Sequence, residues 1–403
     1  MKFLSYITEK RSDEYPALNG IRAFSIMMII GLHIWIGANH FIPDIPVLLD
    51  TALKNLTAGI DLFFVLSGFL IYGNLLKEKA KHGNIKLSFF YIKRSLRIFP
   101  AYYFLLLVQY VSMRGILKSL NAAPHLDSSK TLLKNSLTEN ISYYWADLLY
   151  ISNYTKGRMF DYGWSLSIEE QFYIILPPLC ALLFFKISDK ARRILLISSY
   201  FLPILFRILY SQFNIFSPHM VYQHSETRFD SLIAGMLCSE FYLSASYANF
   251  TTKKFIRIGL YIASITLTAI GFLSERTALT QIYVYNCLNI GFAGLVLLSL
   301  WENSYFSKFL SLPIFRPIAR VSYTMYLWHL YPTSAAISLV CGTVIHSLSY
   351  SRTFATFLVA MLFTFIFCVI LFYLIERPFL ILKDKWIAHL KSKQTAGISQ
   401  QSI

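Results

Sequence analysis

The sequence predicts an all-α protein that crosses a membrane many times. Of its 403 residues, 56% are hydrophobic and only 14% are charged, whereas a soluble domain carries about 25% charged residues. The mean hydropathy is +0.51. Apolar residues gather in stretches near the ~20 residues that a membrane-spanning helix needs. We therefore expect one domain, residues 1–380, of about ten transmembrane helices. We expect the basic and polar tail, residues 381–403, to be disordered.

The predicted spans follow one another along the chain. They are Ala17–Ala38, Gly59–Leu76, Ile98–Met113, Ile168–Lys186, Ile194–Phe213, Phe229–Tyr247, Phe255–Leu273, Leu279–Leu300, Ile318–Val340 and Thr353–Ile375. The first span follows a basic start but lacks a small-residue cleavage site. We therefore expect it to stay in the protein, unlike a signal peptide.

Basic residues are concentrated in alternate loops and in the tail. The segment 77–97, between the second and third spans, is especially rich in lysine and arginine. Because cytoplasmic loops of membrane proteins carry the excess of Lys and Arg, this alternation predicts that both termini are cytoplasmic. The same rule accounts for the net charge of +16, so we expect membrane lipids and not nucleic acid as the surroundings. The long loop Arg114–Ser167 then faces outward, as a functional loop or as a spacer.

Arg22 and His33 lie in the first predicted span, eleven residues apart. This separation is about three helical turns, or roughly 16 Å, so both side chains share nearly one face. Ionisable groups inside a membrane are costly and usually functional. Asp61 enters the second span from the same outer side as His33. An imidazole beside a carboxylate is a good general base. The alternatives are that His33 has only a structural role and that Asp61 only stabilises the positive N-terminal end of its helix.

Arg94 and Arg97 are three residues apart and share a helix face. Paired guanidinium groups bind phosphate well. The alternative is that they anchor the chain at the membrane surface, as many basic clusters do.

Trp164, Glu169 and Glu170 open the fourth predicted span. They suit acceptor binding, with the indole as a platform for a sugar ring. The alternative is that the two glutamates occupy the first helical turn, where the helix dipole favours acids. Arg228 and Asp230 start the sixth span, and they pair with each other or with these glutamates.

Neither a metal site nor a disulfide framework is expected. The five cysteines are scattered and form no CxxC pair, and Glu169 and Glu170 lack further metal ligands nearby.

Seven stretches, taken in order, resemble the acyltransferase 3 family of membrane acyltransferases. They are Leu18–Arg22 with His33, Gly59–Ile71, Arg94–Arg97, Trp164–Tyr173, Thr227–Asp230, Ser322–His329 and Glu376–Pro378.

The resemblance implies transfer of an acyl group, usually acetyl, from a cytoplasmic acyl-CoA to a hydroxyl of an extracytoplasmic glycan. It implies that Arg22 and His33 are essential and that Arg94 and Arg97 help to bind the donor. Acetyl-CoA is then a substrate and not a permanently bound cofactor, and the bacterial inner membrane is the expected location. The chain looks like the stand-alone type without a fused hydrolase-like domain. It completes transfer itself or passes the acyl group to a separate extracytoplasmic partner.

Two routes fit this chemistry: direct attack by a deprotonated sugar hydroxyl, or an acyl-histidine intermediate. Either route needs an oxyanion stabiliser, for which Ser67 and Trp164 are candidates. The rival hypothesis is a transporter or flippase of a lipid-linked sugar, which also carries ionisable groups inside the membrane. A sensory or scaffold protein has less support because it has no need of Arg22 and His33 there.

Overall fold

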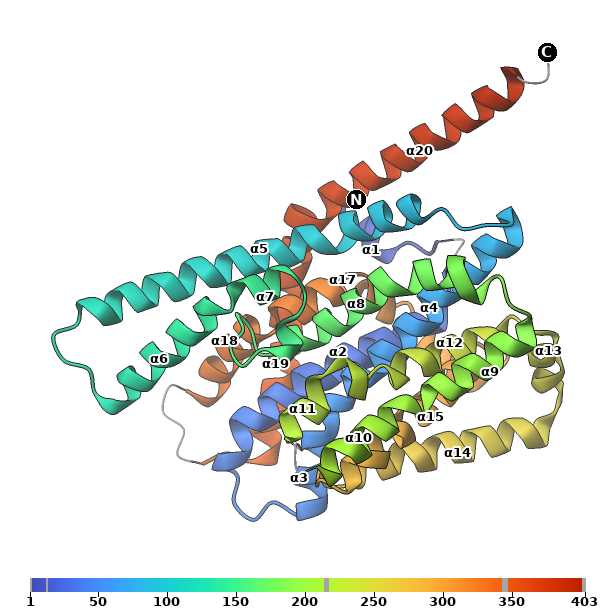
Figure 1. Cartoon of the computed structure of the whole chain (residues 1–403). Coiled ribbons are helices and arrows are strands. Elements are labelled where there is room, and N and C mark those ends of the chain that lie inside the picture. The colour runs from blue at the N-terminus through green and yellow to red at the C-terminus, as the bar shows by residue number, and fades with distance from the viewer. Residues whose placement is uncertain (1, 12–13, 214–216, 343–346, 401–403) are drawn as a thin grey trace.

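The structure is a computed structural model that describes residues 2–11, 14–213, 217–342 and 347–400. All regular secondary structure within these ranges is helical, which confirms the predicted all-α class. Figure 1 shows long helices lying side by side in a bundle, with the last helix projecting from it.

The helix bounds fall into two halves of the chain. The first half contains α1 (Lys2–Thr8), α2 (Pro16–Ala38), α3 (Val47–Lys54), α4 (Gly59–His82), α5 (Leu87–Ala122), α6 (Ser128–Ser142), α7 (Tyr144–Leu148), α8 (Gly163–Leu179), α9 (Asp189–Tyr200) and α10 (Leu202–Gln212). The second half contains α11 (Pro218–Gln223), α12 (Asp230–Tyr242), α13 (Ala245–Thr252), α14 (Lys254–Leu273), α15 (Thr280–Ser299), α16 (Tyr305–Leu310), α17 (Phe315–Trp328), α18 (Leu330–Cys341), α19 (Tyr350–Leu371) and α20 (Arg377–Gln400). Short helices join them: η1 (Asn39–Phe41), η2 (Asn55–Ala58), η3 (Ser152–Tyr154), η4 (Cys180–Phe184), η5 (Ser225–Thr227) and η6 (Phe372–Glu376).

Eight helical segments of the described chain are long and apolar enough to cross a membrane, which confirms a multi-pass membrane protein. Two predicted spans fall outside this group. Phe229–Tyr247 becomes α12, which has 13 residues, most of them buried. At 1.5 Å per residue, such a helix is shorter than the ~30 Å hydrocarbon core. Ile318–Val340 is divided between α17 and α18, which meet at His329. The number of crossings and the cytoplasmic location of the termini stay predictions.

The two ends of the bundle differ in what they carry. The "basic end" holds α1, the start of α5, α13 and α20, and the "far end" holds α3, α6 and α11 (Figure 1). The two terminal regions meet at the basic end, where the rings of Tyr6 in α1 and Phe372 in η6 lie 5.7 Å apart. The prediction assigns the basic end to the cytoplasm.

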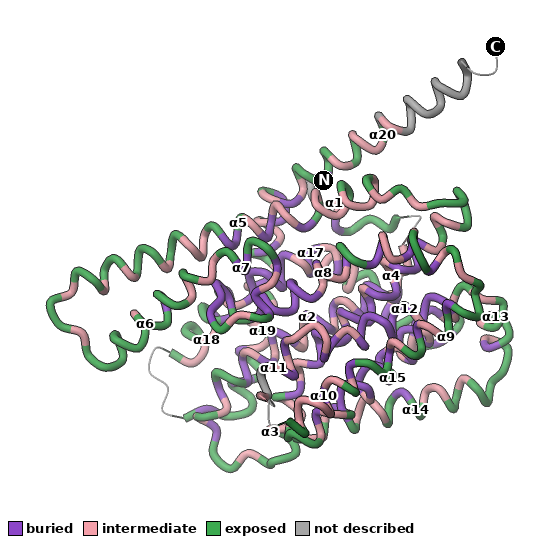
Figure 2. Tube along the Cα trace, in the orientation of Figure 1, coloured by how far each residue is buried: buried purple, intermediate pink, exposed green. Residues whose placement is uncertain are grey.

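Helices α4 and α12 form the closest contact in the bundle's interior. A Cβ atom added to Gly68 would lie 1.9 Å from the carbonyl oxygen of Leu232, and one added to Gly235 would lie 2.0 Å from that of Val65. Because only glycine permits this approach, the two backbones touch, as is common between membrane helices. Figure 2 shows buried residues concentrated in these inner helices, while α5, α6 and α14 are largely exposed.

Two terminal or loop segments differ from the sequence prediction. The outward loop expected from Arg114 is largely helical, because α5 continues to Ala122 and α6 packs back against it. The tail expected to be disordered from residue 381 is helical to Gln400. Its first part is rich in strong helix formers such as Leu, Lys and Ala, so local propensity favours extending the helix.

Candidate functional site

A cavity in the middle of the bundle is lined by three arginines, Arg22 from α2 and Arg94 and Arg97 from α5. We call it the arginine cavity. Its volume is about 110 Å³, well above the 10–15 Å³ that one water molecule needs. Arg94 and Arg97 point into it together, as expected for positions i and i+3. The other lining residues include Ser67, Ser165, Glu169, Glu170, Tyr173, Ser322, Tyr323 and Tyr326.

The positive charge of this cavity is only partly neutralised. The Arg94 guanidinium stacks on the ring of Tyr173 at 3.5 Å, and its Nη2 lies 3.8 Å from Glu169 Oε1. Glu169 also accepts hydrogen bonds from Ser67 and Tyr173. Arg22 and Arg97 make no side-chain hydrogen bond or ion pair with the residues that the structure describes. Two guanidinium groups therefore face the cavity without a bound counter-ion from the protein.

A second cavity connects the first with the basic end. The two cavities share Arg22, Leu70, Arg97, Ser322 and Tyr323 in their walls. The second has a volume of about 210 Å³ and is also lined by residues of α1, the α1–α2 connection and α20, which include Tyr6, Arg11 and Lys383. A basic path therefore runs from the end of the bundle that carries the termini to its middle.

Glu14 neutralises other arginines along this path. It lies just before α2, where it accepts hydrogen bonds from Arg316, at 2.9 Å, and from Arg320. Burial raises the pKa of Glu14, but these hydrogen bonds outweigh burial and hold its pKa below the usual value. Arg316 and Arg320 are thus already paired, which leaves Arg22 and Arg97 as cations for a ligand.

His33 lies toward the far end, next to a second histidine. The imidazole rings of His33 and His329 are 4.9 Å apart. His329 is fully buried, whereas His33 is half-buried. Neither is among the residues that line the arginine cavity, but Tyr326, one turn from His329 on α17, is. The contact between Ser165 and Tyr326 therefore separates the cavity from the histidines.

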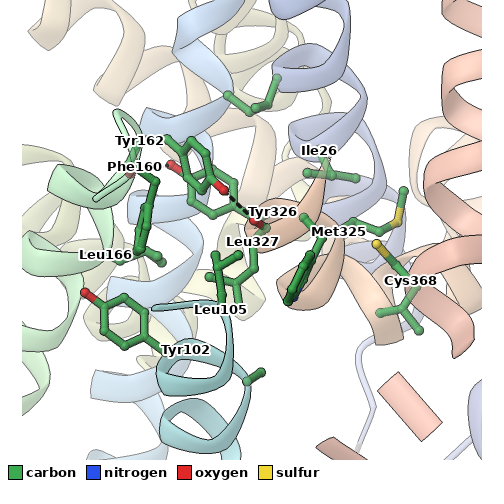
Figure 3. Packing of buried hydrophobic residues seen from close by; sticks show 14 of the residues in the cluster. Ile26, Tyr102, Leu105, Phe160, Tyr162, Leu166, Met325, Tyr326, Leu327 and Cys368 are labelled. Atoms are coloured by element: carbon green, nitrogen blue, oxygen red, sulfur yellow. Dashed lines mark hydrogen bonds between the residues drawn. The ribbon is translucent and has the colours of Figure 1, made fainter. Parts of the chain in front are cut away.

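This separating wall is well packed. Tyr162 donates a hydrogen bond to the carbonyl of Leu327, and Tyr326 contacts the Ser165 hydroxyl. Figure 3 shows Tyr162, Tyr326 and Leu327 together with Phe160 and Leu166 in the aromatic core. The wall joins α8 to α17, and the ring of Tyr326, which lines the arginine cavity, lies 6.0 Å from that of His329.

The structure pairs Asp61 with Arg228 and not with His33. Asp61 Oδ1 accepts a hydrogen bond from Arg228 Nη2 at 2.7 Å and another from Ser231 at 3.1 Å. Both charged side chains are buried. The expectation that Asp61 lies beside the His33 imidazole is therefore wrong. The cause is the close α4–α12 contact, which turns the Asp61 face of α4 toward α12.

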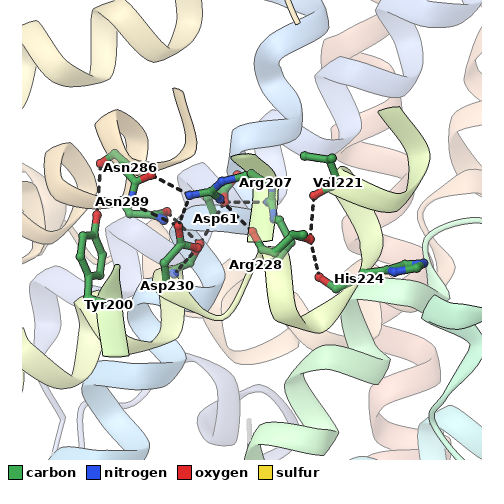
Figure 4. A network of polar contacts seen from close by, with 11 residues as sticks. Asp61, Tyr200, Arg207, Val221, His224, Arg228, Asp230, Asn286 and Asn289 are labelled. Atoms are coloured by element: carbon green, nitrogen blue, oxygen red, sulfur yellow. Dashed lines mark hydrogen bonds and ion pairs between the residues drawn. The ribbon is translucent and has the colours of Figure 1, made fainter. Parts of the chain in front are cut away.

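Arg228 and Asp230 also have other partners than those expected. Asp230 Oδ2 accepts a hydrogen bond from Arg207 Nη2 at 2.8 Å, and Arg207 also donates to Asn286 at 2.6 Å (Figure 4). Arg228 therefore pairs with neither Asp230 nor the two glutamates. These contacts tie α10, α4, α12 and α15 together in one polar network.

Trp164 and the two glutamates also occupy unexpected surroundings. Trp164 is buried, packing edge-to-face on Phe64 and against Tyr222. Its ring is thus not an open platform for a sugar. Helix α8 begins at Gly163 and has no acid in its first turn, so Glu169 and Glu170 do not act through the helix N-terminus. Instead they line the arginine cavity.

Comparison with known protein families identifies the family of this chain. Residues 15–373 match the acyltransferase domain model of acyltransferase family 3. The chain belongs to the acyltransferase 3 family. The matched region contains Arg94 and Arg97 of α5, which line the cavity, and also His33 and His329. The comparison with solved structures found no match.

Relatives of this acyltransferase 3 family member are found in Staphylococcus aureus. The O-acetyltransferase OatA of strain NCTC 8325 / PS 47 is 27% identical over 335 residues, covering 79% of this chain and 50% of the relative. A putative O-acetyltransferase of strain COL is 28% identical over 342 residues, covering 79% and 51%. The chain thus spans about half the length of the curated relatives it matches.

Two residues, one in the polar network and one in the wall of the arginine cavity, were not singled out from the sequence. Arg207 is a lone cation in the apolar span Ile194–Phe213 and was a visible signal for a buried ion pair. Tyr326 was visible only as part of an aromatic run. Its place between the cavity and His329 depends on how α17 packs against α8.

Proposed function

We propose that this protein is a membrane O-acyltransferase of the bacterial inner membrane. It moves an acyl group, acetyl in the first instance, from cytoplasmic acyl-CoA to a hydroxyl of an extracytoplasmic polysaccharide or lipid-linked sugar. The family membership and the names of the relatives support acetyl transfer. The observation that carries the donor assignment is the arginine cavity, whose Arg22 and Arg97 lack counter-ions and which is continued toward the basic end by the second cavity.

The phosphates of coenzyme A suit these guanidinium groups. Arginine binds phosphate through charge and paired hydrogen bonds, and a charge-assisted hydrogen bond contributes roughly 1.5–3 kcal/mol. With the phosphates toward the basic end, the thioester arm extends toward Tyr326. The wall between Ser165 and Tyr326 has to open before the thioester meets His33.

His33 is the proposed general base. Its ring is only half-buried, and we propose that the acceptor reaches it from the far end. In direct transfer, His33 takes the proton of the sugar hydroxyl, and the sugar oxygen forms a bond with the thioester carbonyl carbon. The carbon–sulfur bond then breaks, and the coenzyme thiolate leaves and takes up a proton. In the alternative route, His33 first carries the acyl group itself, before the sugar or a separate partner receives it.

The test uses everted membrane vesicles that contain the protein and labelled acetyl-CoA. We expect label in the glycan fraction, and a loss of at least about 100-fold in His33→Ala, since a general base contributes roughly 10²–10⁴-fold. His40→Ala is the matched control, because His40 is exposed one segment beyond the end of α2. Label that enters the glycan equally in His33→Ala would overturn the proposal. Sugar translocation without any labelling would favour the transporter.

The donor site has its own test. Arg97→Gln should raise the KM for acetyl-CoA by about 10–100-fold, corresponding to the loss of about 1.5–3 kcal/mol of charge-assisted bonding. The control is Lys93→Gln, on the same helix but not among the residues that line either cavity. Equal KM values in the two variants would mean that Arg97 anchors the chain at the membrane surface and does not bind the donor.

A further inference from the structure

The second histidine, His329, presents an unused hydrogen-bond acceptor in a buried place. Its Nδ1 lies 2.8 Å from the carbonyl oxygen of Tyr326. A carbonyl only accepts hydrogen bonds, so Nδ1 carries the proton and Nε2 carries a lone pair. Nε2 is buried and has no partner among the residues that the structure describes. Such an atom calls for an explanation, because buried polar atoms are nearly always hydrogen-bonded.

The neighbouring tyrosines cannot satisfy this acceptor. The rings of Tyr162 and Tyr326 lie 5.1 and 6.0 Å from that of His329. The hydroxyl of Tyr162 already donates to Leu327, and that of Tyr326 contacts Ser165, which itself donates to the Tyr162 carbonyl. Their protons are committed to these bonds.

His33 is the remaining ring neighbour with a donor to offer. Its imidazole centre is 4.9 Å from that of His329, with the planes tilted by 46°. The two rings make no hydrogen bond in this conformation, but catalytic hydrogen bonds often tighten only when substrate binds. A rotation of the half-buried His33 ring brings an N–H edge toward Nε2.

We propose that His329 is a positioning residue for His33: its Nε2 accepts a hydrogen bond from one ring nitrogen of His33. The other nitrogen of His33 is then unprotonated and free for the acceptor hydroxyl. This inference rests on the proposed role of His33 as a base. The neutral imidazole of His329 would orient the base, as a carboxylate does in other acid–base pairs. It does so without the cost of burying an unpaired negative charge.

The proposal also connects the donor cavity with the histidines. The Tyr326 side chain lines the arginine cavity, and its carbonyl holds Nδ1 of His329. A donor that displaces Tyr326 therefore acts on the residue that orients His33. Tyr326 thus lines the donor cavity and, through its carbonyl oxygen, holds His329, the proposed partner of the base His33.

The experiment compares His329→Gln with His329→Asn. A glutamine amide reaches the position of Nε2 and offers an acceptor to His33, whereas an asparagine amide reaches only the position of Nδ1. We expect His329→Asn to lower kcat by about 10–100-fold, as removal of an orienting partner typically does, with the KM for acetyl-CoA unchanged. His329→Gln should keep at least about tenfold more activity than His329→Asn. Equal kcat values in the two variants would overturn the proposal.

A second readout does not depend on turnover. Diethyl pyrocarbonate acylates an unprotonated imidazole nitrogen, and mass spectrometry gives its rate at His33. We expect this rate to fall about tenfold in His329→Asn and to change less than about threefold in His329→Gln, because an accepting neighbour keeps the outward nitrogen unprotonated. The exposed His40 serves as the internal control. An unchanged His33 rate in His329→Asn would contradict the positioning role.

Two further measurements keep the outcomes separate. If His329→Asn does not give folded protein, His329→Met replaces it, because methionine fills the space without an accepting nitrogen. Its His33 rate should match that expected for His329→Asn, and a wild-type rate would overturn the proposal. The modification rate at His33 can depend on an acceptor at position 329 while no acetyl label reaches glycan. In that case His329 positions His33, but the proposed function fails.

Discussion

The arginines at the centre of this protein fall into two kinds, according to whether a carboxylate pairs with them. Arg228 meets Asp61 at 2.7 Å, and both are shielded from solvent. Arg22 and Arg97 lack such a partner in the described chain and face a cavity. A buried ion pair is part of the structure, whereas an unpaired cation beside a cavity is poised for an anionic ligand.

Asp147 in α7 gives a pH-dependent prediction at the residue scale. Burial raises the pKa of Asp147 to about 6, although the Met159 amide donates to its Oδ2 at 2.8 Å. Between about pH 4 and 6 the folded protein binds this proton and the unfolded chain does not, so the free energy of unfolding falls as pH rises. Asp147→Asn removes this dependence.

We expect the melting temperature of Asp147→Asn, relative to wild type, to increase from pH 4 to pH 7 and then to level off. Differential scanning fluorimetry in detergent measures it. The size corresponds to on the order of 2–3 kcal/mol, at about 1.4 kcal/mol for each pKa unit. A difference that stays constant over this range would mean that Asp147 does not titrate there.

At the scale of elements, the α4–α12 contact decides the role of Asp61. The glycines that let the two backbones touch also bring Asp61 against Arg228 and Ser231. The ion pair is therefore part of a helix interface. It does not include the histidine pair, which α2 and the junction between α17 and α18 form.

This interface gives a prediction that separates structure from catalysis. Asp61→Leu leaves Arg228 buried without its counter-ion and should cost roughly 3–5 kcal/mol, whereas an apolar replacement of both members is often nearly neutral. We expect the yield of monodisperse protein to fall sharply in Asp61→Leu and to recover in Asp61→Leu with Arg228→Met. The recovered variant should also transfer acetyl groups. A stable but inactive double variant would mean that Asp61 has a role in catalysis and not only in the helix interface.

At the scale of the whole molecule, the site has two unlike approaches. The cavities run from the basic end to the middle of the bundle, and His33 lies toward the far end. In the proposed function, this arrangement lets a charged donor and a carbohydrate approach from opposite sides of a membrane. It requires that the basic end face the cytoplasm, as the distribution of Lys and Arg predicts.

Cysteine labelling tests this orientation. Ser128→Cys places a thiol at the start of α6, at the far end, and Ser246→Cys places one in α13, at the basic end, both at exposed positions. In intact cells, a membrane-impermeant maleimide should label the first at least about tenfold more than the second, because only one face is accessible. The parent protein gives the background from its own cysteines. Preferential labelling of Ser246→Cys would reverse the topology and remove the proposed donor route.

Sequence reasoning succeeded where the signal is local. Composition and the length of apolar stretches predicted the helical membrane class, and seven ordered motifs predicted the family. Helical spacing placed Arg94 and Arg97 on one face, and both line the cavity. The same reasoning misplaced the partners of Asp61, Arg228 and Asp230, since sequence separation along a span gives depth but not the direction in which a side chain faces.

The sequence by itself determined that this chain is a bundle of membrane helices of the acyltransferase 3 family, because hydropathy and motif order are properties of contiguous residues. Only the tertiary structure decided which charges are paired, that Trp164 is buried, and that His33 has His329 and not Asp61 beside it. The physical reason is that these contacts join residues of different helices, such as Asp61 with Arg228 and His33 with His329. They depend on which helix faces meet. For Asp61 and Arg228, this choice is set by the glycines that let the backbones of α4 and α12 touch.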